Sequence, residues 1–416
     1  MPQDRSKVVV IGAGIVGVST AIWALREGFL VTLIDRAAPG QATSSGNAGL
    51  LASAAIVPVP VPGLLSKAPR MALDPRQPLF VRWSHLIRSA PWLWRYLRQA
   101  NVDAATKRAL SILPLTGDSL ADHLALAEGT GAERWILPCD YLAGYPSRAT
   151  YHADRFAWQL RREAGFEVES LDGEALRIYD PAIGTTIGCA ALVPGHGRIT
   201  DPGRYVQTLA QHAQKQGVQI LRAEIEAVLR EKGHVTGIRA GGEVIECDKV
   251  VVTAGIWSGP LAKDLGLKAH LAPESGFHLE LWEPSVMPRS PMMISEGKFV
   301  MTPMDGRLRL AGMVGHLGLD AVAPEAPYRL FEHHIKRVLP SLTWGEATRW
   351  MGHRPAMSDS CPMIGEVPNI AGAYVGFGHD HVGLTAGPRT GQILAHLLAG
   401  KRPNIDLSPY SPDRFA

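Results

Sequence analysis

The chain has 416 residues, of which 46% are hydrophobic and 19% charged, a balance typical of a soluble globular protein large enough for two domains. The formal net charge is only +3 and there is no long basic run, which argues against a nucleic-acid partner. The four cysteines are scattered and form no CxxC pair, so we predict neither a disulfide framework nor a zinc site, and reduced thiols favour a cytoplasmic location.

The N-terminus lacks the features of a secretion signal. A polar leader runs to Lys7 and then directly into a short apolar run, with glycines where a cleavage region would lie. The later apolar stretch 50–65 contains Pro58, Pro60 and Pro62, which make it unfit as a membrane helix. We therefore expect no transmembrane segment.

The first element is a nucleotide-binding pattern. A β-branched run, Val8 to Ile11, leads into Gly12, Gly14 and Gly17, and a helical pattern follows over residues 15–27. In such a motif the first glycine permits a tight turn and the second lets the backbone approach a pyrophosphate. The third allows close packing of helix on strand, and the helix N-terminus attracts the phosphates.

A second strand, Leu30 to Ile34, ends in Asp35, close to the spacing at which an acid grips ribose hydroxyls. The alternative is a glycine-rich turn in a βαβ unit that binds no nucleotide. The position of Asp35 at the end of the second strand argues against this alternative. Arg36 is also compatible with a 2′-phosphate partner for NADP. The small, polar, glycine-bearing loop 41–50 favours FAD instead, because an NAD dehydrogenase would normally proceed to another βα unit here.

From Pro58 to about Asp122 the pattern is helical. Aromatic residues alternate there with arginines: Trp83, Trp92, Trp94 and Tyr96 with Arg82, Arg88, Arg95 and Arg98. Such a mixture is compatible with a patch that touches a membrane surface. Aromatic packing in a cap, with the arginines extended to solvent, is the preferred interpretation.

The middle of the chain returns to alternating helix and strand. Asp201 caps a predicted helix that begins with Pro202 and ends near Gly217. Strands follow, and a β-branched strand ends in Ala254-Gly255, whose backbone is expected near the nucleotide.

The remaining chain is mostly strand-like. Residues 267–343 alternate in strand fashion, with a hairpin turn predicted at Asp305-Gly306. The chain closes with a final helix predicted over residues 386–398.

Together these motifs resemble the D-amino acid oxidase superfamily, and most of all the bacterial D-amino acid dehydrogenases. The matching segments are Gly12–Gly17, Thr43–Gly49, Thr253–Ser258, Gly352–Pro355, Asp359–Gly365 and Gly378–Thr385. They occur in the order of that superfamily and span nearly the whole chain.

The resemblance implies an α/β fold, α+β overall, with a Rossmann-like FAD-binding domain of the glutathione-reductase type and a mixed β-sheet substrate or cap domain. The expected FAD-binding domain is discontinuous, from residues 1–60, 196–262 and 346–416. The expected substrate domain comprises residues 61–195 and 263–345.

The resemblance also implies which positions hold FAD. The turn Gly383 to Thr385 resembles the segment whose amides face the flavin pyrimidine ring, at the start of a helix whose dipole favours the anionic reduced flavin. The full set of expected cofactor-binding residues is Gly12, Ala13, Gly14, Ile15, Val16, Gly17, Asp35, Arg36, Ser44, Ser45, Asn47, Ala48, Gly49, Leu50, Ile225, Ala254, Gly255, Trp257, Gly378, His379, Gly383, Leu384 and Thr385. Some relatives tether FAD to a cysteine in the strand matching residues 298–304, and because this sequence has none there, we expect non-covalent FAD.

For the substrate, Arg354 resembles the family arginine that pairs with a carboxylate, a task suited to its planar fork. The alternative for Arg354 is a structural ion pair. His278, His379 and His381 are candidate catalytic residues in the pocket, each as readily structural. We expect no metal at His379 and His381, because the sequence suggests no third ligand.

The implied reaction is hydride transfer from Cα of a D-amino acid to flavin N5, giving an imino acid that hydrolyses to a 2-oxo acid and ammonia. Alternatives are a cyclic or secondary amino acid (D-hydroxyproline, D-proline, sarcosine or glycine), or a FAD-binding subunit of a larger complex. His353 before the arginine, and the polar His379-Asp380-His381 loop, depart from the commoner family pattern. The electron acceptor is expected to be oxygen or a quinone of the respiratory chain, with possible peripheral contact at the inner face of the membrane.

Overall fold

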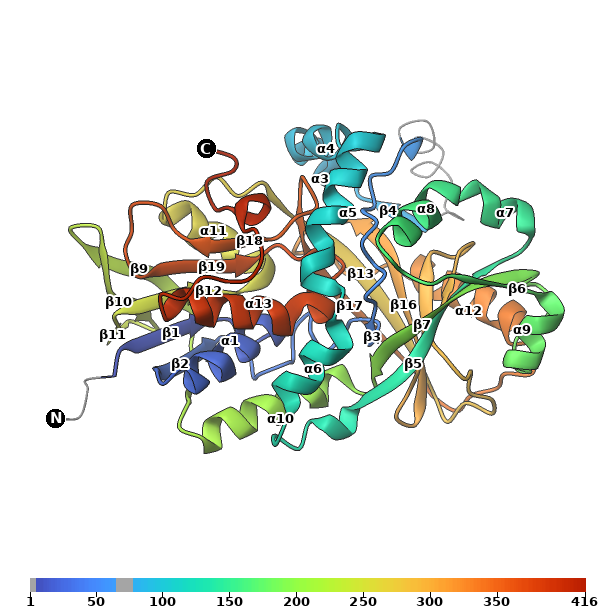
Figure 1. Ribbon diagram of the computed structural model, residues 1–416, viewed down its shortest axis with the longest axis horizontal. Coiled ribbons are helices and arrows are strands. Elements are labelled where there is room, and N and C mark those ends of the chain that lie inside the picture. Colours follow the sequence, from blue (N-terminus) through green and yellow to red (C-terminus); the bar gives the residue numbers. More distant parts are fainter. Residues whose placement is uncertain (1–4, 65–77) are drawn as a thin grey trace.

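The computed structural model describes residues 5–64 and 78–416. The segment 65–77, part of the predicted helical region 58–122, lies outside the described residues, as does the side chain of Trp83. Figure 1 shows two large sheets side by side, one carrying the N-terminal strand and the other spanning the opposite half of the molecule. The mixed α/β architecture confirms the predicted fold class.

The first sheet has the expected Rossmann-like arrangement. Its strands lie in the order β18-β19-β12-β1-β2-β8, all parallel except β18, which is antiparallel to β19. Their bounds are β1 Lys7–Ile11, β2 Leu30–Asp35, β8 Gln219–Arg222, β12 Lys249–Val252, β18 Met363–Glu366 and β19 Ala373–Phe377.

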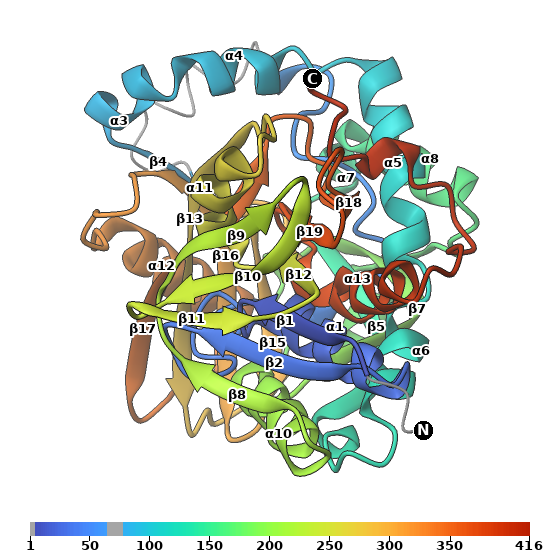
Figure 2. The same cartoon turned by 90° about the vertical axis from the view of Figure 1, so that its left-hand side faces the viewer.

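Both faces of this sheet are covered, which explains the unbroken apolar run of β1. Val8 and Val10 pack toward α1 (Ile15–Arg26), α10 (Pro202–Lys215) and α13 (Gly383–Leu398). Val9 and Ile11 pack on the other face against the three-stranded sheet β9 (Ile225–Glu231), β10 (His234–Ala240) and β11 (Glu243–Glu246). Figure 2 shows that small sheet in front of β1 and β2.

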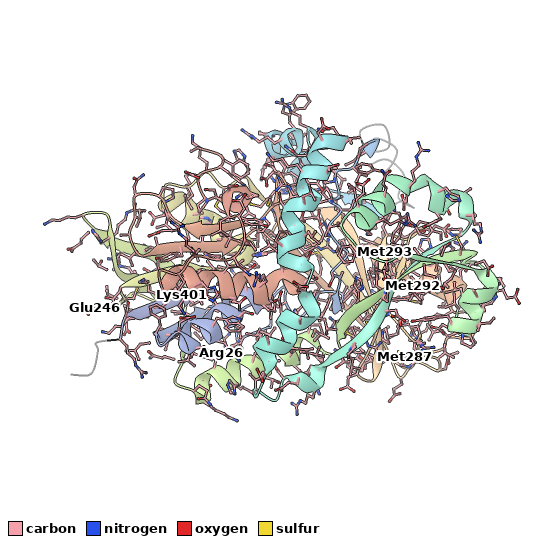
Figure 3. All side chains as sticks on the ribbon, viewed as in Figure 1. Arg26, Glu246, Met287, Met292, Met293 and Lys401 are labelled. Carbon is pink, nitrogen blue, oxygen red and sulfur yellow. The ribbon has the colours of Figure 1, made fainter. Side chains whose placement is uncertain are left out.

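The second sheet has ten strands in the order β17-β13-β16-β15-β14-β5-β7-β3, with β4 paired to β16 and β6 to β7. Their bounds are β3 Leu50–Leu51, β4 Leu79–Val81, β5 Ile136–Tyr145, β6 Glu169–Asp172, β7 Cys189–Ile199, β13 Leu271–Trp282, β14 Met292–Ile294, β15 Phe299–Met304, β16 Arg307–His316 and β17 Ala347–Met357. On β14, Met292 and its neighbour Met293 are labelled in Figure 3. Met292 is buried in the core of the sheet, whereas Met293 lines a cavity described below.

Helices join and cover the two sheets. They are α3 Trp83–Arg88, α4 Ala90–Leu97, α5 Val102–Thr116, α6 Ser119–Ala127, α7 Arg148–Ala153, α8 Arg155–Glu163, α9 Gly173–Tyr179, α11 Ser258–Asp264 and α12 Ala326–Val338, with short 3-10 turns at Glu133–Trp135, Gly255–Trp257 and Ser408–Tyr410. Among the described residues, no helix is long and apolar enough to cross a membrane.

The predicted strand pattern over residues 267–343 is wrong at α12. Its buried residues Tyr328, Phe331, Ile335 and Val338 recur at helical spacing, so they form one apolar stripe that packs on the ten-stranded sheet. The hairpin at Asp305-Gly306, which joins β15 to β16, is confirmed.

Strand β17 joins the two halves of the molecule. The predicted division placed residues 346–416 with the FAD-binding domain, but β17 pairs along its whole length with β13 of the ten-stranded sheet. The chain then enters the six-stranded sheet at β18. The segment containing Arg354 thus leads from the large sheet directly to the nucleotide-binding sheet.

Candidate active site

One large cavity, of about 1580 Å³, is lined by residues of both large sheets. It reaches from the nucleotide-binding motif of β1 and α1 to Arg354 on β17 and to the loop before α13. Pockets for drug-sized ligands are typically about 300–1000 Å³. This volume therefore accommodates an extended cofactor together with a small substrate.

At one end the cavity has a dinucleotide cradle. Asp35 accepts the backbone N–H groups of Ala13 at 2.7 Å and Ala37 at 3.0 Å, which fixes its carboxylate at the end of β2. Gly12 has a φ of +105°, and a Cβ there would lie 2.6 Å from the carbonyl oxygen of Thr253. Helix α1 begins after Gly14, which has no side chain that could cap it. Among the described residues, only the first amide of the helix, that of Ile15, donates to a side chain, so the amides that follow it stay free near the cavity.

The loop 43–50 forms the next part of the wall. The Ser44 hydroxyl accepts the N–H of Ile15 at 2.9 Å, and the Asn47 side chain bridges Ser44 to Gly49 within the loop. From the large sheet, Arg309 donates to the carbonyl oxygens of Ser45 and Asn47 at 2.8 Å and 2.7 Å.

The charge of Arg309 is balanced inside the sheet. Its guanidinium contacts the Glu280 carboxylate at 2.7 Å, and Glu280 also pairs with Arg307. Burial would raise the pKa of Glu280, but the two arginines outweigh it and lower the pKa to about 2. This buried ion network therefore ties the predicted cofactor loop to the substrate sheet.

Trp350 of β17 packs across the same loop. A Cβ at Gly46 or at Gly352 would lie only 2.2 Å from its ring, so both positions must be glycine for the indole to fit. His278 stacks on the other side of Trp350 at a centroid distance of 5.1 Å, and its Nδ1 lies 3.1 Å from the Gly46 carbonyl oxygen. Burial, with Arg309 nearby, lowers the pKa of His278 to about 4, so the ring is neutral at pH 7.

At the other end of the cavity, Arg354 pairs with Glu274 on the neighbouring strand β13. Arg354 Nη1 donates to Glu274 Oε1 at 2.8 Å and to the Met313 carbonyl oxygen at 3.0 Å. Nη2 makes only a 3.4 Å contact with the Gly312 carbonyl oxygen, and Nε has no hydrogen-bond partner among the described residues. Gly276 gives the guanidinium its room, since a Cβ there would lie 2.6 Å from Arg354 Cζ.

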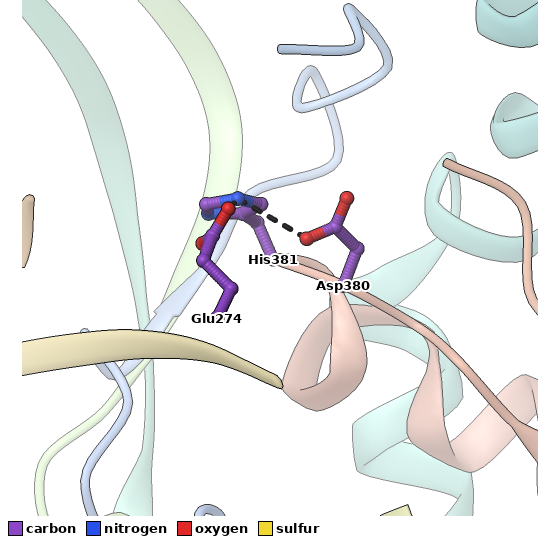
Figure 4. Close-up of side chains that lie close together, drawn as sticks. All are labelled: Glu274, Asp380 and His381. Carbon is purple, nitrogen blue, oxygen red and sulfur yellow. Dashed lines mark ion pairs between the residues drawn. The ribbon is translucent and has the colours of Figure 1, made fainter. Parts of the chain in front are cut away.

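Glu274 also belongs to a second cluster, drawn in Figure 4. His381 Nε2 lies 3.0 Å from Glu274 Oε1 and 3.2 Å from Asp380 Oδ1. Burial would lower the pKa of His381, but the two carboxylates outweigh it and raise the pKa. Burial would raise the pKa of Glu274, but His381 and Arg354 hold it well below its usual range.

His379 is not part of this cluster and lies next to the start of α13. Its Nε2 pairs with the Thr390 hydroxyl at 2.9 Å, and burial lowers its pKa to about 4. The ring is neutral and lines the cavity beside Gly383, where α13 begins.

The cavity brings together most of the residues expected from the sequence. Those that line it are Gly12, Gly14, Ile15, Val16, Asp35, Arg36, Ser44, Asn47, Ala48, Leu50, Ile225, Ala254, Gly255, Trp257, Arg354, Gly378, His379, His381, Gly383, Leu384 and Thr385. Arg36 lies over the Trp257 ring, 3.9 Å from its centroid. Ala13, Gly17, Ser45, Gly49 and His278 stand behind the lining, where they shape or support it.

Sequence reasoning missed four polar residues: Glu274, Asp380, Glu280 and Arg309. A charged residue inside an otherwise apolar strand was the available signal, because such a residue is costly to bury without a partner. The partners themselves lie on other strands and were not readable.

Glu274, Asp380 and His381 place ligand-type atoms within 4.8 Å of one another. The same Glu274 oxygen that faces His381 already pairs with the Arg354 cation. We therefore interpret the group as an ion cluster, and the expectation of no metal stays a prediction.

The lining residues suit FAD. A closed glycine turn, a helix N-terminus whose amides after Ile15 are free, and a fixed carboxylate lie at one end of an elongated cavity. The start of a second long helix, α13, lies at the other end. Cys139, Cys189, Cys247 and Cys361 are all outside the lining of this cavity.

The chain is similar to known proteins in sequence and in fold. A family model described as FAD dependent oxidoreductase (DAO) matches residues 7–397. A D-amino-acid oxidase of Bradyrhizobium diazoefficiens is 37% identical over 422 residues, covering 100% of both chains. Among solved structures, glycine oxidase from Geobacillus kaustophilus has a TM-score of 0.78 at 20% identity, with 99% of each chain covered. L-proline dehydrogenase from P. horikoshii has a TM-score of 0.73 at 17% identity, covering 99% of this chain and 98% of that one.

Replacing Arg309 by methionine should loosen the cofactor loop. The change leaves the Ser45 and Asn47 carbonyl oxygens without their donor, while Glu280 keeps Arg307, so we expect a loss of about 3 kcal/mol of stability. If about 1.4 kcal/mol of this lost stability weakens FAD binding, the FAD dissociation constant rises about tenfold. Flavin fluorescence titration of the apoprotein measures it.

The control is Arg337→Met, because among the described residues the Arg337 side chain pairs only with the exposed Glu296. Its stability should change by about 0.5 kcal/mol or less. Equal FAD affinity in Arg309→Met and the unaltered protein would contradict a role for Arg309 in holding the loop.

Proposed function

The chain belongs to the DAO family of FAD-dependent oxidoreductases, and we propose that within this family it oxidises the carbon–nitrogen bond of a D-amino acid. The observation that carries this proposal is the position of Arg354. Its guanidinium stands in the wall of the same cavity as the dinucleotide cradle, with Nε unpaired among the described residues and Nη2 only weakly engaged. The Nε–Nη2 edge is the planar fork that binds a carboxylate in two hydrogen bonds.

FAD in this cavity supplies the two-electron acceptor for the hydrogen that leaves Cα as hydride. Arg354 holds the substrate carboxylate and so fixes the orientation of Cα. Apolar and aromatic residues, including Trp350, Met351 and Met293, line part of the remaining wall and reduce the access of water to the reacting atoms. The imino acid product then hydrolyses to a 2-oxo acid and ammonia.

The choice of a D-amino acid is supported by the 37% identical D-amino-acid oxidase. The second candidate substrate is a cyclic or secondary amino acid, or glycine. The structural likeness to an L-proline dehydrogenase and to a glycine oxidase supports this candidate. The ratio of kcat/KM for primary D-amino acids to that for D-proline, cis-4-hydroxy-D-proline, sarcosine and glycine separates these two candidates. A ratio below one would favour the second.

We propose that FAD is held without a covalent bond, since no cysteine among the described residues lines the cavity. Oxygen and a respiratory quinone remain the two candidate electron acceptors. Rates of turnover with oxygen and with a soluble quinone, compared on one preparation, distinguish them.

Arg354→Lys should lower kcat/KM by about 100-fold or more, corresponding to about 3 kcal/mol of lost transition-state binding. Lysine still offers a cation to Glu274, so folding and flavin content should persist. Steady-state kinetics and the flavin-to-protein absorbance ratio measure both effects.

The matched control is Arg349→Lys, on the same strand, whose side chain pairs with the exposed Glu325. Its kinetics should be unchanged. Near-normal kcat and KM in Arg354→Lys would overturn the assignment of the carboxylate clamp.

A respiratory quinone would require contact with a membrane surface, and we propose α3 and α4 for this contact. Ile87 and Trp94 are 74% and 66% exposed, and Arg88 and Arg95 are exposed beside them. Trp92 and Tyr96 on the same helix are buried, as expected for cap residues.

Trp94→Gln should reduce binding to anionic lipid vesicles several-fold, because an indole at the interface contributes apolar area. Vesicle flotation measures this binding, with Val244→Gln as the control, since Val244 is 56% exposed on β11 of the three-stranded sheet. Failure of the unaltered protein to float with anionic vesicles would exclude the membrane contact.

A further inference from the structure

One nitrogen of the His381 ring, Nε2, faces two acceptors but carries a single hydrogen. It lies between Glu274 Oε1 and Asp380 Oδ1. Glu274 is the closer of the two and also receives Arg354. Asp380 Oδ1 is buried with no hydrogen-bond partner among the described residues.

A carboxylate oxygen in that position is costly, because a buried acceptor without a donor loses its hydration and gains nothing in return. The backbone holds Asp380 there nevertheless. Asp380 adopts a φ of +51°, uncommon for a residue other than glycine, and its N–H donates to the Pro355 carbonyl oxygen at 3.2 Å. The loop therefore presents the Asp380 side chain to the cavity that it lines.

The charged and titratable groups that face Asp380 come from several elements of the fold. His381 is adjacent, Glu274 comes from β13, Arg354 from β17 and Asp359 from the turn after β17, while the Tyr96 hydroxyl approaches from α4. His316 of β16 faces Glu274 from the far side. Arg354 and a protonated His381 carry two positive charges, which offset the two negative charges of Glu274 and an ionised Asp380. The site can therefore hold Asp380 either ionised or protonated.

We propose that Asp380 is the base that removes the proton from the ammonium group of the bound amino acid. This assignment rests on the proposed function, since a carboxylate held on Arg354 brings the ammonium group on the same Cα to this part of the cavity. One N–H bond of the ammonium breaks and one O–H bond forms on Asp380, giving a neutral amine and a carboxylic acid. No electrons are transferred in this step, and the amine lone pair is then available to assist loss of hydride from Cα.

The protonation equilibrium suits this role. Burial raises the pKa of Asp380 to about 6, with Glu274 adding to the rise and His381 and Arg354 opposing it. A general base works best when its pKa lies near the operating pH. Asp380 is ionised and able to accept a proton above about pH 6, and loses that ability as the pH falls below it.

The test is anaerobic flavin reduction by a D-amino acid, followed by stopped-flow absorbance from pH 5 to pH 10, in the FAD-loaded protein and in Asp380→Asn. In the unaltered protein, reduction should slow only below about pH 6. In Asp380→Asn the amine must lose its proton to water instead, so the rate should be about 100-fold lower at pH 7 and rise about tenfold per pH unit. An Asp380→Asn rate within threefold of the unaltered protein, with the same pH profile, overturns the assignment.

A second readout does not depend on oxidation. 2-Aminoisobutyrate has no hydrogen on Cα, so its binding can be followed by calorimetry in buffers of different ionisation enthalpy. If the proton passes to Asp380, binding to the unaltered protein releases no proton to the buffer, whereas binding of the neutral amine to Asp380→Asn releases one. Equal proton counts for the two proteins would also contradict the proposal.

Two further variants complete the design. His381→Gln removes a cation that lowers the pKa of Asp380, so the acid limb of the rate profile should move to higher pH. Asp103→Asn, an exposed acid on α5 outside the cavity lining, should leave the profile unchanged. If no amino acid reduces the flavin of the unaltered protein, the proposed function fails together with this assignment, whereas reduction with an unchanged profile in Asp380→Asn removes the assignment alone.

Discussion

A buried arginine can serve a substrate carboxylate only if another group balances its charge when no substrate is bound. In this chain that group is Glu274, 2.8 Å from Arg354 on the neighbouring strand. The pair explains much of the surrounding sequence: Gly276 opens the space for the guanidinium, and His381 supplies Glu274 with a second cation. Because Glu274 occupies only one edge of Arg354, the other edge remains for a ligand, and the structural ion pair and the carboxylate clamp are compatible interpretations of one residue.

The same principle fixes the cofactor loop. Arg309 reaches from the substrate sheet to two carbonyl oxygens of the loop 43–50, and Glu280 balances its charge. Trp350 then packs over Gly46 of that loop. Both contacts join the nucleotide-binding sheet to the substrate sheet across the cavity.

Local signals in the sequence predicted the parts of the site that depend on local structure. The glycine motif, Asp35, the hairpin at Asp305-Gly306 and the last helix each follow from residues within one turn or one strand. The ion pairs do not. Arg354 and Glu274 are far apart in the chain and meet only through the register of β13 and β17. His278 was a candidate catalytic residue by position, yet it lies opposite Trp350 in the pairing of β13 with β17, and Trp350, which stacks on its ring, lines the cavity in its place. Helix α12 was missed because its apolar stripe was interpreted with the wrong period.

We propose that Arg354 holds the carboxylate of a D-amino acid while FAD in the same cavity oxidises its Cα. The most direct measurement is anaerobic titration of the purified flavoprotein with the D- and L-forms of the same amino acid, while the flavin absorbance is recorded. The account predicts that the D-form bleaches the flavin at one equivalent and that its L-partner leaves it oxidised. Bleaching by the L-form alone, or by neither form of any amino acid tested, would contradict it.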